Sequence, residues 1–87
     1  MEREKVYKII DGERDHQDEL WNVATTISEN KHTPEEWIMY MMDYLSEASH
    51  ILSREAAQTG RPKAMEIVRK VVAMGIAAME EHETKPR

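Results

Sequence analysis

The chain has 87 residues, a formal net charge of −5 and no cysteine. This length allows one domain, over residues 1–87, and excludes a second domain with its own core. The lack of cysteine excludes disulfides and thiolate metal sites, and the acidic balance argues against a nucleic-acid-binding protein, which needs net positive charge. So short a chain buries only roughly 60–65% of its unfolded surface, so helical packing or oligomerisation must supply stability.

The sequence has no pattern typical of secretion or of membrane insertion. Its N-terminal residues are charged and lead into no apolar stretch. The longest strongly apolar run, Val71–Met79, is far shorter than the roughly 20 residues that span a bilayer. We therefore expect a cytoplasmic protein without a membrane partner, and a flexible tail at residues 83–87.

Turn signals divide the chain into three predicted helices, at about residues 2–24, 34–58 and 62–82. The second begins with an N-cap Thr33, Pro34 at the first helical position and Glu36 completing a capping box. Its expected end lies near Gly60, and Pro62 would open the third helix. Because the period-2 alternation of strands is absent, we predict an all-α fold, a three-helix antiparallel bundle.

The first helix has polar side chains in the middle of its apolar stripe. The stripe consists of Val6, Ile9, Ile10, Leu20, Ala24 and Ile27. At 100° per residue Glu13 lies at its centre, with His16 and Gln17 on its shoulders. Buried polar groups are costly unless they are hydrogen-bonded. Glu13 and Gln17 therefore either bond across the bundle or face a ligand, and both readings stay open.

The second helix is expected to bury one face and to carry a polar stripe beside it. The predicted buried residues are Trp37, Ile38, Met41, Tyr44, Leu45, Ala48, Leu52 and Ala56. The polar stripe consists of Asp43, Glu47, His50 and Arg54. A metal, a cation or a phosphate held by Arg54 would explain two like charges four residues apart, and a solvated face explains them equally well.

The third helix is apolar over more than half of its circumference. The exceptions are a strip of Glu66, Arg69, Ala73, Ala77 and Glu80. So wide an apolar arc needs neighbours on two sides, which a small monomer hardly provides. We therefore predict a homo-oligomer through this helix. The small residues that would allow close approach are Ala73, Gly75, Ala77 and Ala78.

Two glutamate–histidine pairs have the spacing found in carboxylate-bridged dimetal bundles, which makes a dimetal site a minor alternative. The pairs are Glu13 with His16 and Glu47 with His50, and the further glutamates needed would be Glu66 and Glu80. In so acidic a chain such pairs arise easily by chance. The sequence has no serine elbow and no glycine-rich phosphate loop, so nucleophilic catalysis has no support.

Three blocks follow one another along the chain: Glu13–Trp21 (ERDHQDELW), Pro34–Trp37 (PEEW) and Asp43–Ala48 (DYLSEA). Together with the third predicted helix, they resemble short phage proteins that are distantly similar to MazG-type all-α nucleotide pyrophosphohydrolases. Enzymes of that family bind magnesium and a nucleoside triphosphate through Glu-Glu-x-x-Glu on one helix and Glu-x-x-Asp on the next.

In this chain the corresponding motifs read Asp43-Tyr44-Leu45-Ser46-Glu47 and Glu66-Ile67-Val68-Arg69. Tyr44 and Arg69 thus stand where the family has carboxylates. Magnesium prefers anionic oxygen ligands, whereas arginine can grip phosphate directly. The resemblance therefore implies binding without hydrolysis, and no cofactor.

The leading hypothesis that this resemblance implies is a non-catalytic pocket for a phosphate-containing, nucleotide-like molecule. The predicted ligand-binding residues are Glu13, Gln17, Trp21, Tyr44, Glu47, Arg54, Arg69 and Lys70. Arginine and lysine would hold phosphate, Trp21, Trp37 or Tyr44 would stack on a base, and Glu13 and Gln17 would read its polar edges. For Trp37 a core position is the simpler role. A phage protein of this kind would sequester a host defence signal in the host cytoplasm.

Two alternatives remain. One is a magnesium-dependent pyrophosphohydrolase, with metal ligands drawn from Asp43, Glu47, His50 and Glu66, and with Glu13 as a further candidate. It would require compensation for Tyr44 and Arg69. The other is a helical interaction module whose apolar face binds a host or phage protein.

Overall fold

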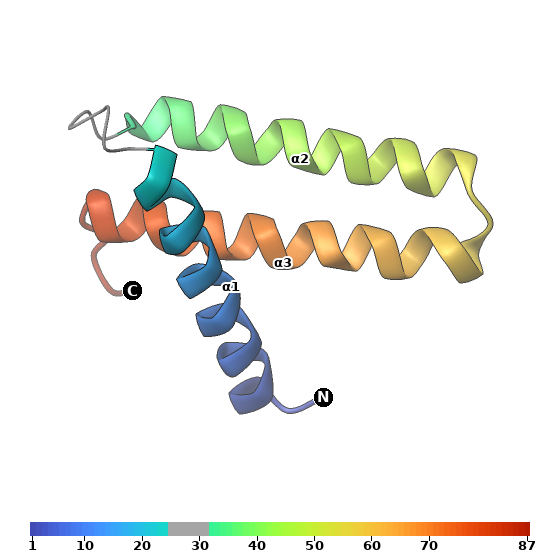
Figure 1. Ribbon diagram of the computed structural model, residues 1–87, viewed down its shortest axis with the longest axis horizontal. Coiled ribbons are helices and arrows are strands. Elements are labelled where there is room, and N and C mark those ends of the chain that lie inside the picture. Colours follow the sequence, from blue (N-terminus) through green and yellow to red (C-terminus); the bar gives the residue numbers. More distant parts are fainter. Residues whose placement is uncertain (25–31) are drawn as a thin grey trace.

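The computed structural model describes residues 1–24 and 32–87, and of residues 21–24 it describes the backbone alone. Within these ranges the chain forms three α-helices and no strand: α1 (Arg3–Ala24), α2 (Pro34–Arg54) and α3 (Ala57–Glu81) (Figure 1). The predicted all-α fold is confirmed. Across the described residues, none of the helices combines the length and the apolarity that crossing a bilayer requires.

The start of α2 agrees with the prediction. Thr33 Oγ1 accepts a hydrogen bond from the Glu36 backbone N–H at 3.1 Å, and the Thr33 N–H donates to Glu36 Oε1 at 3.0 Å. This capping box satisfies donors that the start of a helix leaves free. The pKa of Glu36 lies below its ordinary value, chiefly because the Thr33 backbone donates to its carboxylate.

The predicted boundary between the second and third helices is wrong. α2 ends at Arg54 and α3 begins at Ala57, so Gly60 and Pro62 lie inside α3. Gly60 is buried against the end of α2, where an added Cβ would lie 3.4 Å from the Cβ of Glu55. No glycine in the described residues has a positive φ, so Gly60 does not act as a left-handed helix terminator. Packing against α2 overrides the local Gly–Pro signal.

α2 and α3 run antiparallel and make the larger of the helix contacts (Figure 1). One buried cluster contains Trp37, Met74 and Ala77, and a second contains Ala48, Ala64 and Ile67. Trp37 is almost fully buried, which confirms its expected core position. The core is therefore a row along one helix pair in which three alanines alternate with larger apolar side chains.

α1 packs on α3 alone. It crosses α3 obliquely in Figure 1, and within the described residues no contact joins it to α2. Ile10 is its buried apolar residue, and Ala73 of α3 is fully buried. Ala73 and Ala77, which were expected to allow close approach of another copy, are thus buried within the protomer. The three helices form an open arrangement.

Much of the apolar surface that was predicted to be buried is exposed. Ile38, Leu45 and Leu52 of α2 are 54%, 46% and 50% exposed. Tyr44 of α2 is also exposed, as is Ala56, which precedes α3. On α1 the exposed apolar residues are Val6, Ile9 and Leu20, and the Ala24 side chain and Ile27 lie outside the described part. The reason is the open arrangement: among the described helices α2 has α3 alone as a neighbour, so it buries one stripe.

Candidate ligand-binding site

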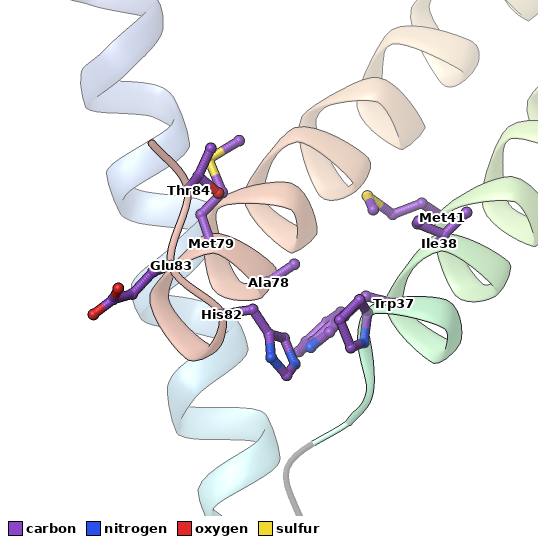
Figure 2. A pocket seen from close by; sticks show the side chains of 9 residues that line it. Trp37, Ile38, Met41, Ala78, Met79, His82, Glu83 and Thr84 are labelled. Carbon is purple, nitrogen blue, oxygen red and sulfur yellow. The ribbon is translucent and has the colours of Figure 1, made fainter. Parts of the chain in front are cut away.

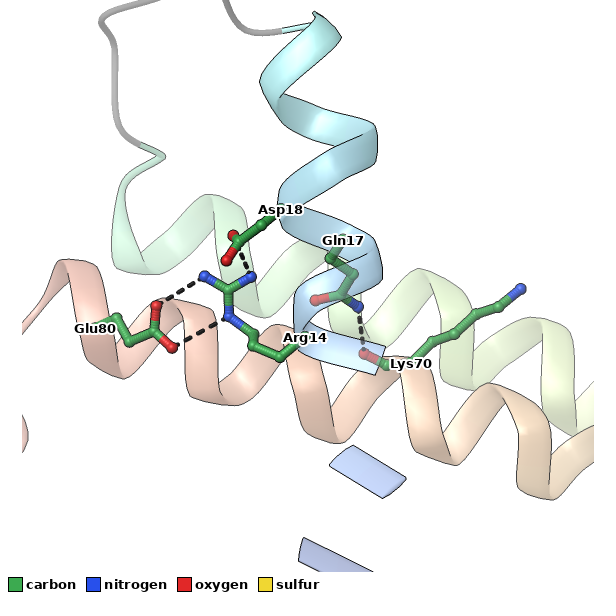
Figure 3. A network of polar contacts seen from close by, with 5 residues as sticks. All are labelled: Arg14, Gln17, Asp18, Lys70 and Glu80. Carbon is green, nitrogen blue, oxygen red and sulfur yellow. Dashed lines mark hydrogen bonds and ion pairs between the residues drawn. The ribbon is translucent and has the colours of Figure 1, made fainter. Parts of the chain in front are cut away.

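The crossing of α1 and α3 brings together four of the predicted ligand-binding residues. Arg69 Nε donates to Glu13 Oε1 at 2.6 Å. One turn further along α1, Gln17 Nε2 donates to the backbone oxygen of Lys70 at 3.2 Å (Figure 3). Both polar side chains of the α1 stripe therefore bond across the helix contact, which is one of the two readings left open. Their role toward a ligand stays a prediction.

The Glu13–Arg69 pair is unequally buried. The Glu13 side chain is 8% exposed, whereas that of Arg69 is 39% exposed. A buried carboxylate needs a charge partner, and the guanidinium supplies it in a charge-assisted hydrogen bond. Within the described part of the chain Arg69 bonds through Nε alone. Its terminal N–H groups have no acceptor there. The ion pair therefore orients the guanidinium and leaves its terminal N–H groups able to donate to another molecule.

Gln17 carries the one buried side-chain oxygen or nitrogen without a hydrogen-bond partner among the described residues. The residue is 5% exposed, and the unpartnered atom is Oε1. Leaving such an acceptor unsatisfied costs about 1–3 kcal/mol. Exchanging the amide oxygen and nitrogen would place two oxygens against each other at Lys70. Gln17 Oε1 therefore needs a donor that the described residues do not provide.

A second polar contact, which the sequence analysis missed, holds α1 to the C-terminal part of α3. Arg14 donates through Nε and Nη2 to the two carboxylate oxygens of Glu80, at 3.2 and 2.7 Å, and through Nη1 to Asp18 (Figure 3). Burial alone would lower the pKa of Arg14, but the hydrogen bonds and charges of Glu80 and Asp18 raise it above its ordinary value. The i,i+4 spacing of Arg14 and Asp18 in the sequence could have revealed that pair, but no sequence signal pairs Arg14 with Glu80.

The other predicted ligand-binding residues are not part of this group. Tyr44, Glu47 and Arg54 lie at exposed positions of α2, and within the described residues no hydrogen bond or ion pair joins them to α1 or α3. Trp21 belongs to α1, but its side chain lies outside the described part. The predicted set is thus divided between the α1–α3 crossing and the surface of α2.

The acidic residues do not converge on a metal site. Among the described residues, no three histidine, aspartate or glutamate side chains lie close enough together to hold a metal ion. Glu13 is bonded to Arg69 and Glu80 to Arg14. The remaining metal candidates, Asp43, Glu47, His50 and Glu66, are exposed on two different helices. Within one protomer, these side chains do not fit a magnesium or dimetal site.

A hollow of about 280 Å³ lies between the start of α2 and the end of α3 (Figure 2). Its walls are Pro34, Trp37, Ile38, Met41, Ala78, Met79, His82, Glu83 and Thr84. Hydrogen bonds close this end of the helix pair: Trp37 Nε1 donates to Glu81 Oε2 at 2.8 Å, and His82 Nε2 to the His32 oxygen at 2.7 Å. Ligand pockets usually measure roughly 300–1,000 Å³. The hollow is therefore better suited to an apolar side chain than to a nucleotide.

Comparisons with protein-family models, with curated proteins and with solved structures find no match to this chain. The MazG-type resemblance and the phage origin therefore stay predictions from the sequence blocks.

Proposed function

We propose that the protein binds a phosphate-containing, nucleotide-like small molecule without hydrolysing it, at the crossing of α1 and α3. The observation that carries the proposal is the buried Gln17 Oε1, which has no hydrogen-bond partner within the described residues. Arg69, which is bonded to Glu13 one turn of α1 away, has N–H donors without an acceptor in the same part of the chain. A ligand with both an N–H donor and phosphate oxygens would satisfy both residues, and a nucleotide has both.

Glu13 has a positioning role in this proposal. Its bond to Arg69 Nε orients the guanidinium, which lowers the conformational entropy that arginine would lose on gripping a phosphate. A phosphate that displaced Glu13 would leave a buried carboxylate without a partner, which is costly. The ligand therefore binds the terminal nitrogens of Arg69 while Glu13 keeps Nε. Lys70, which is exposed on the next position of α3, adds a second positive charge.

Two features favour binding over hydrolysis. Arg69 stands where the MazG-type enzymes that the sequence resembles have a carboxylate, and two glutamates at the α1–α3 contact, Glu13 and Glu80, are already bonded to arginines. The resemblance to phage proteins adds the proposal that the ligand is a host defence signal, because binding without hydrolysis would sequester it.

Self-association through α3 is also part of the proposal. After α1 and α2 have packed on α3, its residues Met65, Val72 and Met79 remain exposed. Apolar side chains that recur along one helix and face solvent are typical of an interaction surface. This supports the expected homo-oligomer.

The test is calorimetric titration with a panel of nucleoside triphosphates and cyclic nucleotides, with and without magnesium, followed by product analysis. We expect at least one ligand to bind without magnesium and to be recovered intact. Arg69→Ala should abolish binding, and Arg61→Ala is the matched control, since Arg61 is an exposed arginine of the same helix. Release of pyrophosphate would contradict the absence of catalysis, and unchanged affinity of Arg69→Ala would contradict the site.

A further inference from the structure

α2 carries a second, mostly apolar stripe in addition to the one that packs on α3. The stripe consists of Ile38, Met42, Leu45, the small Ser49 and Leu52, and all five residues are exposed. They are separated by four, three, four and three residues, which is the spacing of a coiled-coil seam. The stripe that packs on α3 runs beside it through Trp37, Met41, Ala48 and Ile51. One helix thus has two seams, and only one of them is covered.

The exposed apolar residues of α3 continue this second stripe. Met65, Val72 and Met79 are seven residues apart, so they lie on one side of α3. Met79 lines the same hollow as Ile38 of α2, which places both on the same side of the helix pair (Figure 2). These three residues and the second stripe of α2 together form what we call the outer apolar face.

The accessible surface of the protomer is larger than a monomer of its mass requires. The chain exposes 7319 Å² at a mass of 10.2 kDa. The usual scaling of surface with mass gives roughly 5300 Å² for a compact monomer of that mass. A standard protein interface covers about 800 Å² on each partner. The excess is therefore more than enough for a stable contact between two copies.

Most charges of α2 lie away from this face. At 100° per residue, Glu36, Asp43, Glu47 and Arg54 fall on the opposite side of the helix from the stripe centred on Leu45, and Glu35 falls at its edge, beside Met42. None of the residues of the outer apolar face is charged, and Ser49 is its one polar member. Two acidic chains can therefore bring these faces together while most of their like charges stay apart, with Glu35 at the margin of the contact.

We propose that the outer apolar face is the interface with a second copy of this chain, in which the second stripe of α2 packs against the same stripe of the partner. Under a two-fold axis the same surface of both copies forms the contact, so the surface must be complementary to itself. A stripe with alternating spacings of four and three residues meets this condition, because its side chains can pack as knobs into the holes between the same side chains of the partner. The hollow beside Ile38 and Met79 gives room for an apolar side chain at the end of the face. This inference rests on the self-association proposed above and does not depend on the proposed ligand.

The test compares two leucine-to-glutamate variants by sedimentation equilibrium. Leu45 on the face and Leu20 on α1 are 46% and 58% exposed, so the substitutions are matched in chemistry and exposure. We expect a native mass of at least twice the 10.2 kDa of one chain. Leu45→Glu should raise the dissociation constant at least about tenfold, and Leu20→Glu should leave it unchanged. A monomeric native protein at micromolar concentration, or an unchanged assembly of Leu45→Glu, would overturn the proposal.

Cysteine cross-linking keeps the proposal testable if Leu45→Glu fails to fold. The chain has no cysteine, so a single introduced thiol can pair only with that of another copy. Leu45→Cys lies at the middle of the stripe and should oxidise to a covalent dimer. Glu47→Cys, on the opposite side of α2, should not. Equal cross-linking of both variants, or none by Leu45→Cys, would overturn the interface.

Discussion

Arg69 and Glu13 form a hydrogen-bonded ion pair between α3 and α1, with 2.6 Å between Nε and Oε1 and with the carboxylate almost completely buried. The two partners differ in what their removal leaves behind. Without Arg69 the carboxylate is buried and unpaired, whereas without the charge of Glu13 the guanidinium is still partly solvated.

Arg69→Ala should therefore lower the free energy of unfolding by about 1–3 kcal/mol, and Glu13→Gln by less, about 0.5–1.5 kcal/mol. The double variant should lose less than the sum of the two, since neither charge remains. Urea unfolding at one fixed protein concentration measures all three. Strictly additive losses would mean that the two side chains do not interact.

Gln17→Leu should leave the free energy of unfolding unchanged or raise it by up to about 1 kcal/mol. The substitution removes a hydrogen bond to Lys70, but it also removes the buried oxygen that has no partner among the described residues. Ligand affinity should fall at least about tenfold in the same variant, because the oxygen that is unfavourable in the free protein is the acceptor that the proposed ligand would use. Gln58→Leu, at an exposed position of α3, is the control. A clear loss of stability in Gln17→Leu alone would show that Oε1 is satisfied in solution.

The capping box should make α2 sensitive to acid. The pKa of Glu36 is lowered in the folded state, so its contribution is full above the unfolded pKa and is lost as the pH falls through the folded pKa. Glu36→Gln keeps an acceptor oxygen that does not titrate. On acidification the native chain should therefore lose stability relative to Glu36→Gln, as followed by thermal unfolding across the acid range. A pH-independent difference would contradict this.

Gly60→Ala should stabilise the protein by about 0.5–1 kcal/mol. The nearest atoms to an added Cβ, at 3.4 and 3.5 Å, are in ordinary van der Waals contact, and alanine is the better helix former. Gly12→Ala, where nothing lies within 4 Å of the added Cβ, is the matched control on α1. If Gly60 ended a helix in the left-handed conformation, the same substitution would destabilise the protein. The sign of the change in the free energy of unfolding therefore distinguishes a glycine inside α3 from a glycine that ends a helix. Thermal unfolding measures it.

Local signals in the sequence predicted the fold where no other helix competes with them. The start of α2 follows from Thr33, Pro34 and Glu36, and the two capping hydrogen bonds join Thr33 and Glu36 to each other's backbone. The start of α3 could not be predicted, because Gly60 lies against the end of α2, and the sequence alone does not show that contact. Local chemistry therefore determines a helix cap, but tertiary packing moved a helix boundary by five residues, from 62 to 57.

Apolarity showed which side chains could be buried but not which neighbour would bury them. Ile38, Leu45 and Leu52 were expected in the core together with Trp37, yet α2 packs against one other helix of the described ranges and buries one seam. Glu13 could be identified as an anomaly in an apolar stripe. Its partner Arg69 lies 56 positions further along the sequence, and pairing the two requires the crossing geometry of α1 and α3, which the sequence does not show.

The attachment of α1 has a consequence for how the protein opens. α1 touches α3 alone within the described chain, and side-chain hydrogen bonds of Glu13, Arg14 and Gln17 contribute to that contact. It can therefore detach as a separate cooperative unit, at a lower free energy than global unfolding, while α2 and α3 stay paired. Any molecule held between Gln17 and Arg69 would shift this equilibrium toward the attached state of α1. Ligand binding would therefore be detected first as slower amide hydrogen exchange along α1.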